Sequence, residues 1–217
     1  MCTNYPASAR RSTQSGFSLL EITIVVTIVL AATAAAFANL MPSIYNSRSN
    51  AGMELVLGEM RRAHERAVDE RRIYRVTFNA PNTIQVDVGT VALIGATITD
   101  SAPAFQPAQP PLTLPGNMQF LVIPGIPTGA LTTPDGFGSG NNAIDFDLGN
   151  GGGGTQIYFE PDGRALDAGN RLNNGVVYIA QPTNLFSSRA VSLYGSTGRT
   201  KGWTLTKLAG GATGWTQ

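Results

Sequence analysis

Glu21 is the only charged residue between Phe17 and Met41. A carboxylate at the middle of a bilayer costs on the order of 3 kcal/mol, so acids in apolar segments are usually functional or lie near the membrane interface. Because Glu21 lies only one turn inside the apolar run, we expect a smaller cost at this position. The sequence therefore predicts a functional acid near one end of a membrane segment.

A second group of candidate residues lies near the C-terminus, where the sequence reads Gly198, Arg199, Thr200, Lys201. Two cations beside glycine can contact a phosphate backbone, and the nearby Trp203 can stack on a base. The other interpretation is a turn between two strands with Trp203 in the core, and we favour it over nucleic-acid binding.

The remaining polar candidates are weaker. His64 is the only histidine and has no partnering His, Cys or acid cluster in the sequence, so we expect a structural role. Asp145 and Asp147 would share one strand face and could bind calcium, but a solvated face is the favoured interpretation. The sequence has no Ser-His-Asp set and no metal-ligand spacing, so we expect neither an enzyme nor a bound cofactor.

These residues need elements that position them, and the first element is residues 17–41. At about 1.5 Å per residue, a helix of this length crosses a hydrocarbon core of about 30 Å. Residues 42–72 then form an amphipathic continuation, since apolar residues recur there at spacings of three and four. This apolar stripe consists of Met53, Val56, Met60, Ala63 and Ala67, and charged residues from Glu59 to Glu70 are expected on the opposite face.

Beyond Ile73 the hydrophobic period changes to two, which predicts strands in residues 73–217. The expected strands are 74–78, 83–88, 91–98, 155–160, 175–180, 189–194 and 203–208. Residues 101–154 are rich in glycine and proline and are expected to form mainly loops, with short strands at 112–114, 118–123 and 143–148. The predicted fold class is α+β: a long N-terminal helix followed by an antiparallel β-sheet or sandwich.

Composition limits the function classes. The chain has 15 basic and 14 acidic side chains, so bulk electrostatic capture of nucleic acid is not expected. Its one cysteine is Cys2, which leaves the C-terminal domain without a disulfide or a cysteine metal site. Arg10 and Arg11 precede the apolar segment, and this weak bias favours an N-terminus in the cytoplasm.

The run Gly16, Phe17, Ser18, Leu19, Leu20, Glu21 resembles the processing site of type IV prepilins. The resemblance implies a leader of residues 1–16, cleavage by prepilin peptidase between Gly16 and Phe17, and methylation of the new amino terminus. It also implies that Glu21, as the fifth mature residue, pairs with the terminal amine of a neighbouring subunit. Such pairing is physically reasonable because each charge lacks a partner in lipid.

The helix-to-strand junction and the last third of the chain resemble GspH/FimT-like pseudopilins. The resemblance rests on three stretches of sequence: MRRAHERAVDERRIYRVTF, IYFEPDGRA and AVSLYGSTGRTKGW. The resemblance implies a minor pseudopilin of a type II secretion pseudopilus, with other pilins, the inner-membrane assembly platform and lipid as partners.

The alternative is a FimT-like minor type IV pilin that primes pilus assembly or binds DNA. DNA contact would involve Gly198, Arg199 and Lys201, where the family's last arginine is here a lysine. A membrane-anchored enzyme ranks third.

The expected location follows from the same resemblance. The chain would be a single-pass protein of the bacterial inner membrane, with its C-terminal domain in the periplasm, and would enter a filament after assembly.

Overall fold

The structure is a computed structural model that describes residues 17–89, 104–127, 129, 132–138 and 141–217, with the backbone alone at 38–42. Helix α1 spans Leu19–Glu70 and is the first element of the chain. Two compact units divide the chain after Ser43. The leader and the strand expected at 91–98 lie outside the described residues.

The first unit contains the N-terminal part of α1. Residues Leu19–Phe37 of this helix are long and apolar enough to cross a membrane, and none of them is buried within the chain. The helix continues through Pro42 without a break in its assignment.

The second unit begins with the C-terminal part of α1, whose predicted stripe is confirmed. Val56, Met60, Ala63 and Ala67 are at most 1% exposed and belong to the main core. The helix ends at Glu70 because Arg71 adopts a left-handed φ of 53°. The Arg72 guanidinium then donates to the Gly89 carbonyl at 2.6 and 3.0 Å, which ties the helix end to the second strand.

The charged face of this helix differs from the prediction at one residue. Glu59 is 1% exposed rather than solvated. Its carboxylate accepts a hydrogen bond from Gln109 Nε2 at 2.6 Å and pairs with Arg62 at 2.8 Å. Gln109 comes from the segment that was expected to be mainly loop, so a long-range contact covers this part of the helix.

Two six-stranded sheets complete the unit, and every strand pair in the described residues is antiparallel. The first sheet contains β1 (Tyr74–Asn79), β2 (Thr83–Gly89), β3 (Phe105–Pro107), β4 (Leu112–Thr113), β7 (Gln156–Phe159) and β8 (Ala165–Leu166). The second contains β5 (Gln119–Phe120), β6 (Ile144–Leu148), β9 (Asn174–Gln181), β10 (Asn184–Tyr194), β11 (Arg199–Lys207) and β12 (Thr213–Thr216).

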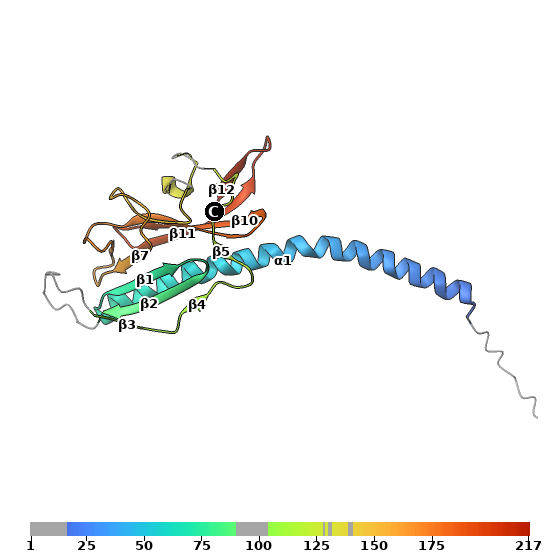
Figure 1. The fold of residues 1–217 in the computed structure, drawn as a ribbon, viewed down its shortest axis with the longest axis horizontal. Helices are drawn as coiled ribbons and strands as arrows, with labels where there is room; N and C mark the ends of the chain where they lie inside the picture. The colour runs from blue at the N-terminus through green and yellow to red at the C-terminus, as the bar shows by residue number, and fades with distance from the viewer. Residues whose placement is uncertain (1–16, 90–103, 128, 130–131, 139–140) are drawn as a thin grey trace, which may run out of the picture. The chain divides into compact units, whose positions relative to one another are not determined.

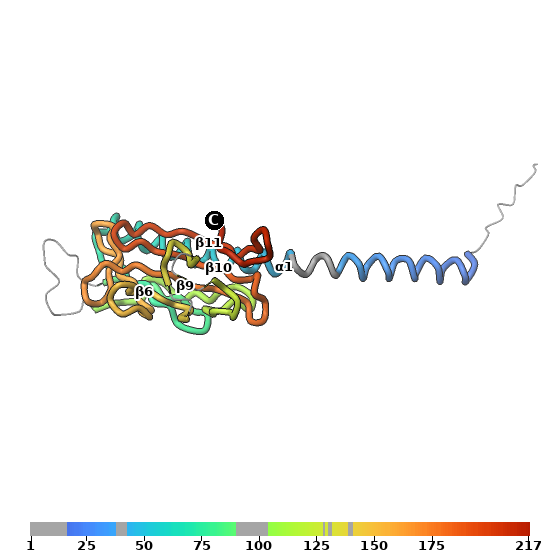
Figure 2. The backbone as a smooth tube through the Cα atoms, turned by 90° about the horizontal axis from the view of Figure 1, so that it is seen from above, coloured from blue at the N-terminus to red at the C-terminus, as the bar shows by residue number. Residues whose placement is uncertain are grey.

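The main core lies between the C-terminal part of α1 and both sheets (Figure 1). Val76 and Phe78 of the first sheet and Ile179 and Val191 of the second contribute fully or almost fully buried side chains to it. The predicted class, an α+β fold with a long N-terminal helix and an antiparallel β domain, is therefore confirmed. Strands β9, β10 and β11 run side by side, as Figure 2 also shows.

The middle of the chain is more ordered than its composition suggested. The short strands expected within 112–123 and at 143–148 are present, and β3 adds one that the sequence did not reveal. Ile126 and its neighbours pack on Val176, Tyr178, Ala190 and Leu205 to form a second apolar cluster. This segment therefore covers the face of the second sheet that points away from α1, and we call that face the outer face.

Candidate functional site

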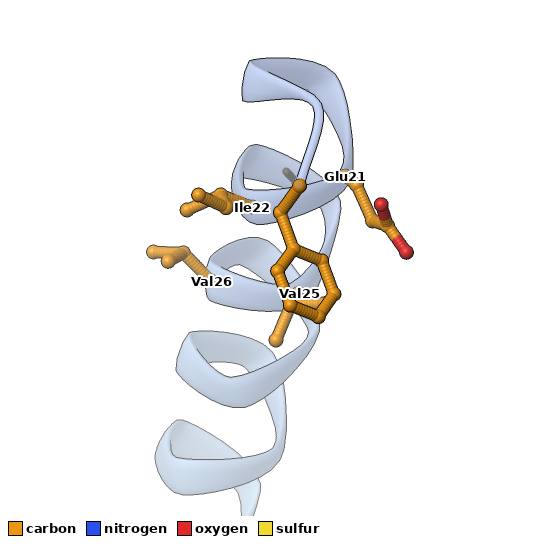
Figure 3. A pocket seen from close by; sticks show the side chains of 5 residues that line it. Glu21, Ile22, Val25 and Val26 are labelled. Carbon is orange, nitrogen blue, oxygen red and sulfur yellow. The ribbon is translucent and has the colours of Figure 1, made fainter. Parts of the chain in front are cut away.

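Glu21 lies in the first turn of α1, where Ile22 N and Glu21 N both donate to the Ser18 carbonyl at 3.2 and 3.0 Å. A carboxylate at a helix N-terminus is favoured by the helix dipole. The Glu21 side chain projects from the opposite side of the helix to Ile22 and Val26 (Figure 3). It has no ion pair in the part of the chain that the structure describes.

The threonine side chains that follow Glu21 in the segment 17–37 are satisfied within the helix. The hydroxyls of Thr23, Thr27 and Thr33 donate to carbonyls three or four residues earlier, at 2.6 to 3.0 Å. Such bonds satisfy a hydroxyl where no water is present, as in lipid or between packed helices. Glu21 therefore differs from its neighbours, because its side chain is the one ionisable group of the segment 17–37.

Of the C-terminal candidates, Arg199 and Lys201 lie on β11, which begins at Arg199, and Gly198 lies in the turn before it. Trp203 and Leu205 pack in the cluster on the outer face, whereas a Cβ at Gly202 would contact Met53 and Leu57 of α1. The β10–β11 register is regular, so side chains alternate between the two faces. Arg199, Lys201, Trp203 and Lys207 therefore all lie on the outer face.

Lys201 is not free on that face. Its Nζ donates to Asp135 Oδ1 at 2.7 Å and lies 5.2 Å from the centre of the Tyr194 ring. Ser192 Oγ donates to the other oxygen of Asp135, and Trp203 Nε1 donates to Ser192 Oγ at 3.0 Å. The lysine and the indole are therefore held in one hydrogen-bonded network on the outer face.

The network determines the charge state of Asp135. Desolvation by burial raises the pKa of its carboxyl, but hydrogen bonds from Lys201, Ser192 and Tyr194 together outweigh burial and lower the pKa below its ordinary value. The same hydrogen bond with Asp135 raises the pKa of Lys201. Both groups are therefore charged at neutral pH and neutralise each other.

Gly198 has a structural reason to be glycine. Its φ is +62°, and a Cβ there would collide with His64 Cδ2 and approach the Gly163 carbonyl oxygen to 2.7 Å. His64 Nε2 donates to that same carbonyl at 3.0 Å, and its ring makes an edge contact with Phe159. His64 thus packs from α1 against the turns that contain Gly163 and Gly198, which is the structural role expected from the sequence.

Among the nucleic-acid candidates, Arg199 alone keeps an exposed side chain at the beginning of β11. Lys201 is committed to Asp135 and Gly198 to packing, so the geometry gives DNA contact by this motif less support than the strand-turn interpretation. That interpretation needs two corrections: Arg199 and Lys201 lie in β11 rather than in the turn, and Trp203 is half-buried in the cluster on the outer face rather than in the main core.

The calcium interpretation of Asp145 and Asp147 gains no support. Asp147 has a left-handed φ of 61°, and the β6–β9 register shifts between Asp145 and Leu148, so simple alternation fails here. Asp145 Oδ1 accepts from Gly153 N at 2.9 Å. Within the described ranges, no group of three or more His, Cys, Asp or Glu residues could hold a metal ion.

Replacing Asp135 by asparagine should destabilise the fold by about 2 kcal/mol at neutral pH, because Lys201 loses its counter-charge and one of the two carboxylate acceptors becomes an amide donor. The folded pKa of Asp135 is depressed, so its stabilising contribution is present above about pH 4 and is lost as the pH falls through the folded pKa. Denaturant titrations of both proteins from pH 7 to pH 3 should show the difference in unfolding free energy shrinking below about pH 4.

An Arg199→Ala variant is the matched control for this experiment. Its side chain is exposed and forms no ion pair with any described residue, so its unfolding free energy should stay within about 0.5 kcal/mol of the parent. A constant difference for Asp135→Asn across the whole pH range would contradict the assigned charge state of Asp135.

Sequence reasoning missed Asp135, Ser192 and Trp215, which complete the surroundings of Lys201 and Trp203. Asp135 lies 66 residues before Lys201, in a 3-10 turn of Pro134–Gly136 with no periodic pattern around it. The available signal was Pro-Asp-Gly, which predicts a turn but no partner for its acid.

Comparison with known proteins gives a similarity at the level of structure. No family model and no curated protein match the chain. The chain is similar to the crystal structure of the type IV minor pilin FimU of Pseudomonas aeruginosa strain PAO1, with a TM-score of 0.40 and 11% sequence identity. The similarity covers 70% of this chain and 85% of that chain.

Proposed function

We propose that this chain is a minor structural subunit of a type IV pilin-like filament, anchored in a membrane before assembly. One observation carries the proposal: the segment Leu19–Phe37 is apolar, exposed along its whole length, and contains a single acid in its first turn. Exposed apolar surface of this extent requires lipid or other helices around it.

The α1 helix explains how one subunit serves both states. Its N-terminal part is stored in lipid and then packs against the same parts of neighbouring subunits, which replaces lipid contacts by helix contacts. Its C-terminal part is built into the core of the β domain through Val56, Met60 and Ala67, so a force on the helix is transmitted to that domain.

Glu21 supplies specificity to this packing. A carboxylate transferred into the apolar interior of a helix bundle needs a cation, and the amine of a mature terminus at Phe17 would be that cation. We therefore propose that prepilin peptidase removes residues 1–16 and that the new terminus of one subunit pairs with Glu21 of the next.

Two systems use subunits of this kind, and the leading assignment is a minor pseudopilin of a type II secretion pseudopilus at the inner membrane. The alternative is a FimT-like minor type IV pilin. Deleting the gene in its own host distinguishes them, because a pseudopilin is needed for protein secretion and a minor pilin for surface pili or DNA uptake.

The processing step has a direct test. Mass spectrometry of the protein purified from its own host should show a chain that begins at Phe17 with a methylated amine. Gly16→Ala should be processed better than a variant with a bulky residue there. A mature pool that retains the peptide containing Met1 and Cys2 would contradict the proposal.

A further inference from the structure

The second sheet ends at β12, whose outer edge is not paired in the part of the chain that the structure describes. Leu208 N donates to Ala212 O at 2.7 Å, so these opposite residues form a hydrogen-bonded pair. Such pairs alternate along an antiparallel ladder, and the next hydrogen-bonded pairs are Thr206 with Gly214 and Thr204 with Thr216. The main-chain groups of Thr213 and Trp215 therefore point away from β11.

A groove of about 430 Å³ lies beside this edge. On one side it is lined by Thr213, Gly214 and Trp215 of β12, with Trp203 and Leu208. On the other side it is lined by Thr132, Thr133, Asp135 and Gly136, from the segment that covers the outer face. The groove therefore joins a free strand edge to a partly apolar trough.

The lining is electrically neutral. Asp135 is the only ionisable residue among the groove residues named above, and it is paired with Lys201 at 2.7 Å. The lining residues themselves therefore offer no free charge to a polyanion or to a strongly charged peptide. The indoles of Trp203 and Trp215 supply large apolar surface instead, and the threonines supply hydroxyls.

Two polar groups beside the groove lack hydrogen-bond partners among the described residues. They are Thr133 Oγ1, in a residue that is 6% exposed, and Trp215 Nε1. Buried polar groups of this kind are normally paired.

We propose that the outer edge of β12 and this groove bind an extended, uncharged peptide segment of a partner protein. The segment would pair with the main-chain groups of Thr213 and Trp215 as an added strand, and its alternate side chains would enter the groove. The occupant is an extended main chain because the outward N–H and C=O groups of Thr213 and Trp215 are spaced as in a β-ladder. The surface of a helix does not present partner groups at this spacing. The proposal does not depend on the system in which the chain works.

The chain offers a built-in reporter, since its two tryptophans both line the groove. The full chain in lipid nanodiscs can be titrated with a capped peptide of alternating threonine and valine that lacks tryptophan. Binding should shift the tryptophan emission. A peptide with proline at alternate positions cannot form the ladder and should leave the emission unchanged.

Thr213→Pro and Thr213→Ala form a matched pair of variants. Both lose the Thr213 hydroxyl bond to the Gly125 carbonyl, which is 3.1 Å long, but only proline removes the outward N–H. We expect at least tenfold weaker binding for Thr213→Pro and a change within about twofold for Thr213→Ala. Equal affinities for the two variants, or no emission change with the parent chain, would overturn the proposal.

Hydrogen exchange provides a readout that needs no variant. The amides of Thr213 and Trp215 should exchange faster than those of Gly214 and Thr216 in the free chain, and the peptide should protect them selectively. If the emission instead changes with protein concentration in detergent without peptide, and Thr213→Pro abolishes that change, the occupant is a second copy and the partner assignment is wrong.

Discussion

A Glu21→Ala variant should remain in the membrane fraction but should fail to enter filaments with its partner subunits. Removing the acid lowers the cost of placing α1 in lipid, by less than the roughly 3 kcal/mol that applies at a bilayer centre. Assembly should be lost because the amine at Phe17 of the neighbouring subunit then has no counter-charge in the helix bundle. Removing one partner of a buried ion pair costs about 3 to 5 kcal/mol, because it leaves an uncompensated charge.

Crosslinking between subunits and recovery of sheared filaments measure this effect. Thr23→Ala is a suitable control on the same helix, because its hydroxyl donates only to the Leu20 carbonyl at 2.8 Å. Glu21→Gln separates charge from shape, and we expect it to resemble the alanine variant. Normal filament recovery with Glu21→Ala would refute the pairing role while leaving the membrane anchor intact.

The helix and most strands could be predicted because their signals are local. A stripe at spacings of three and four, as at Val56, Met60 and Ala63, is produced by one buried helix face regardless of what covers it. The strand pattern of Tyr74, Val76 and Phe78 has the same origin, with alternate residues turned to the core.

The partners of polar side chains could not be predicted in this way. Glu59 is buried because Gln109 reaches it from 50 residues away, and Lys201 is neutralised because Asp135 lies in a turn without hydrophobic period. Both partners come from the glycine- and proline-rich middle, whose composition predicts turns but not their destinations. β12 escaped prediction because its four residues include a glycine and follow a turn rich in glycine.

The same contrast affects the interpretation of the motif at Gly198 and Arg199. A glycine beside cations suits a phosphate site and also suits a tight turn, and sequence alone supplies no contact that separates the two. The structure provides one in His64, whose ring occupies the space that a Cβ at Gly198 would need.

Gly198→Ala should therefore destabilise the full chain strongly, by roughly 3 kcal/mol. About 1 to 2 kcal/mol comes from forcing an L-residue to keep a φ of +62°. The remainder comes from the collision with His64 and with the Gly163 carbonyl oxygen, because overpacking typically costs about 1 to 3 kcal/mol. For a chain of this size, the total corresponds to a fall of roughly 6 to 12 °C in the thermal unfolding midpoint.

Gly210→Ala is the matched control, because Gly210 also has a positive φ of +95° but nothing lies within 4 Å of its added Cβ. It should show only the backbone part of the loss. A double variant with His64→Ala should recover part of the packing cost, although the Gly163 carbonyl remains, and the double-mutant cycle measures the coupling. If Gly198→Ala were no worse than Gly210→Ala, the close packing would not determine the residue at this position, and a contact role for the glycine-arginine motif would regain support.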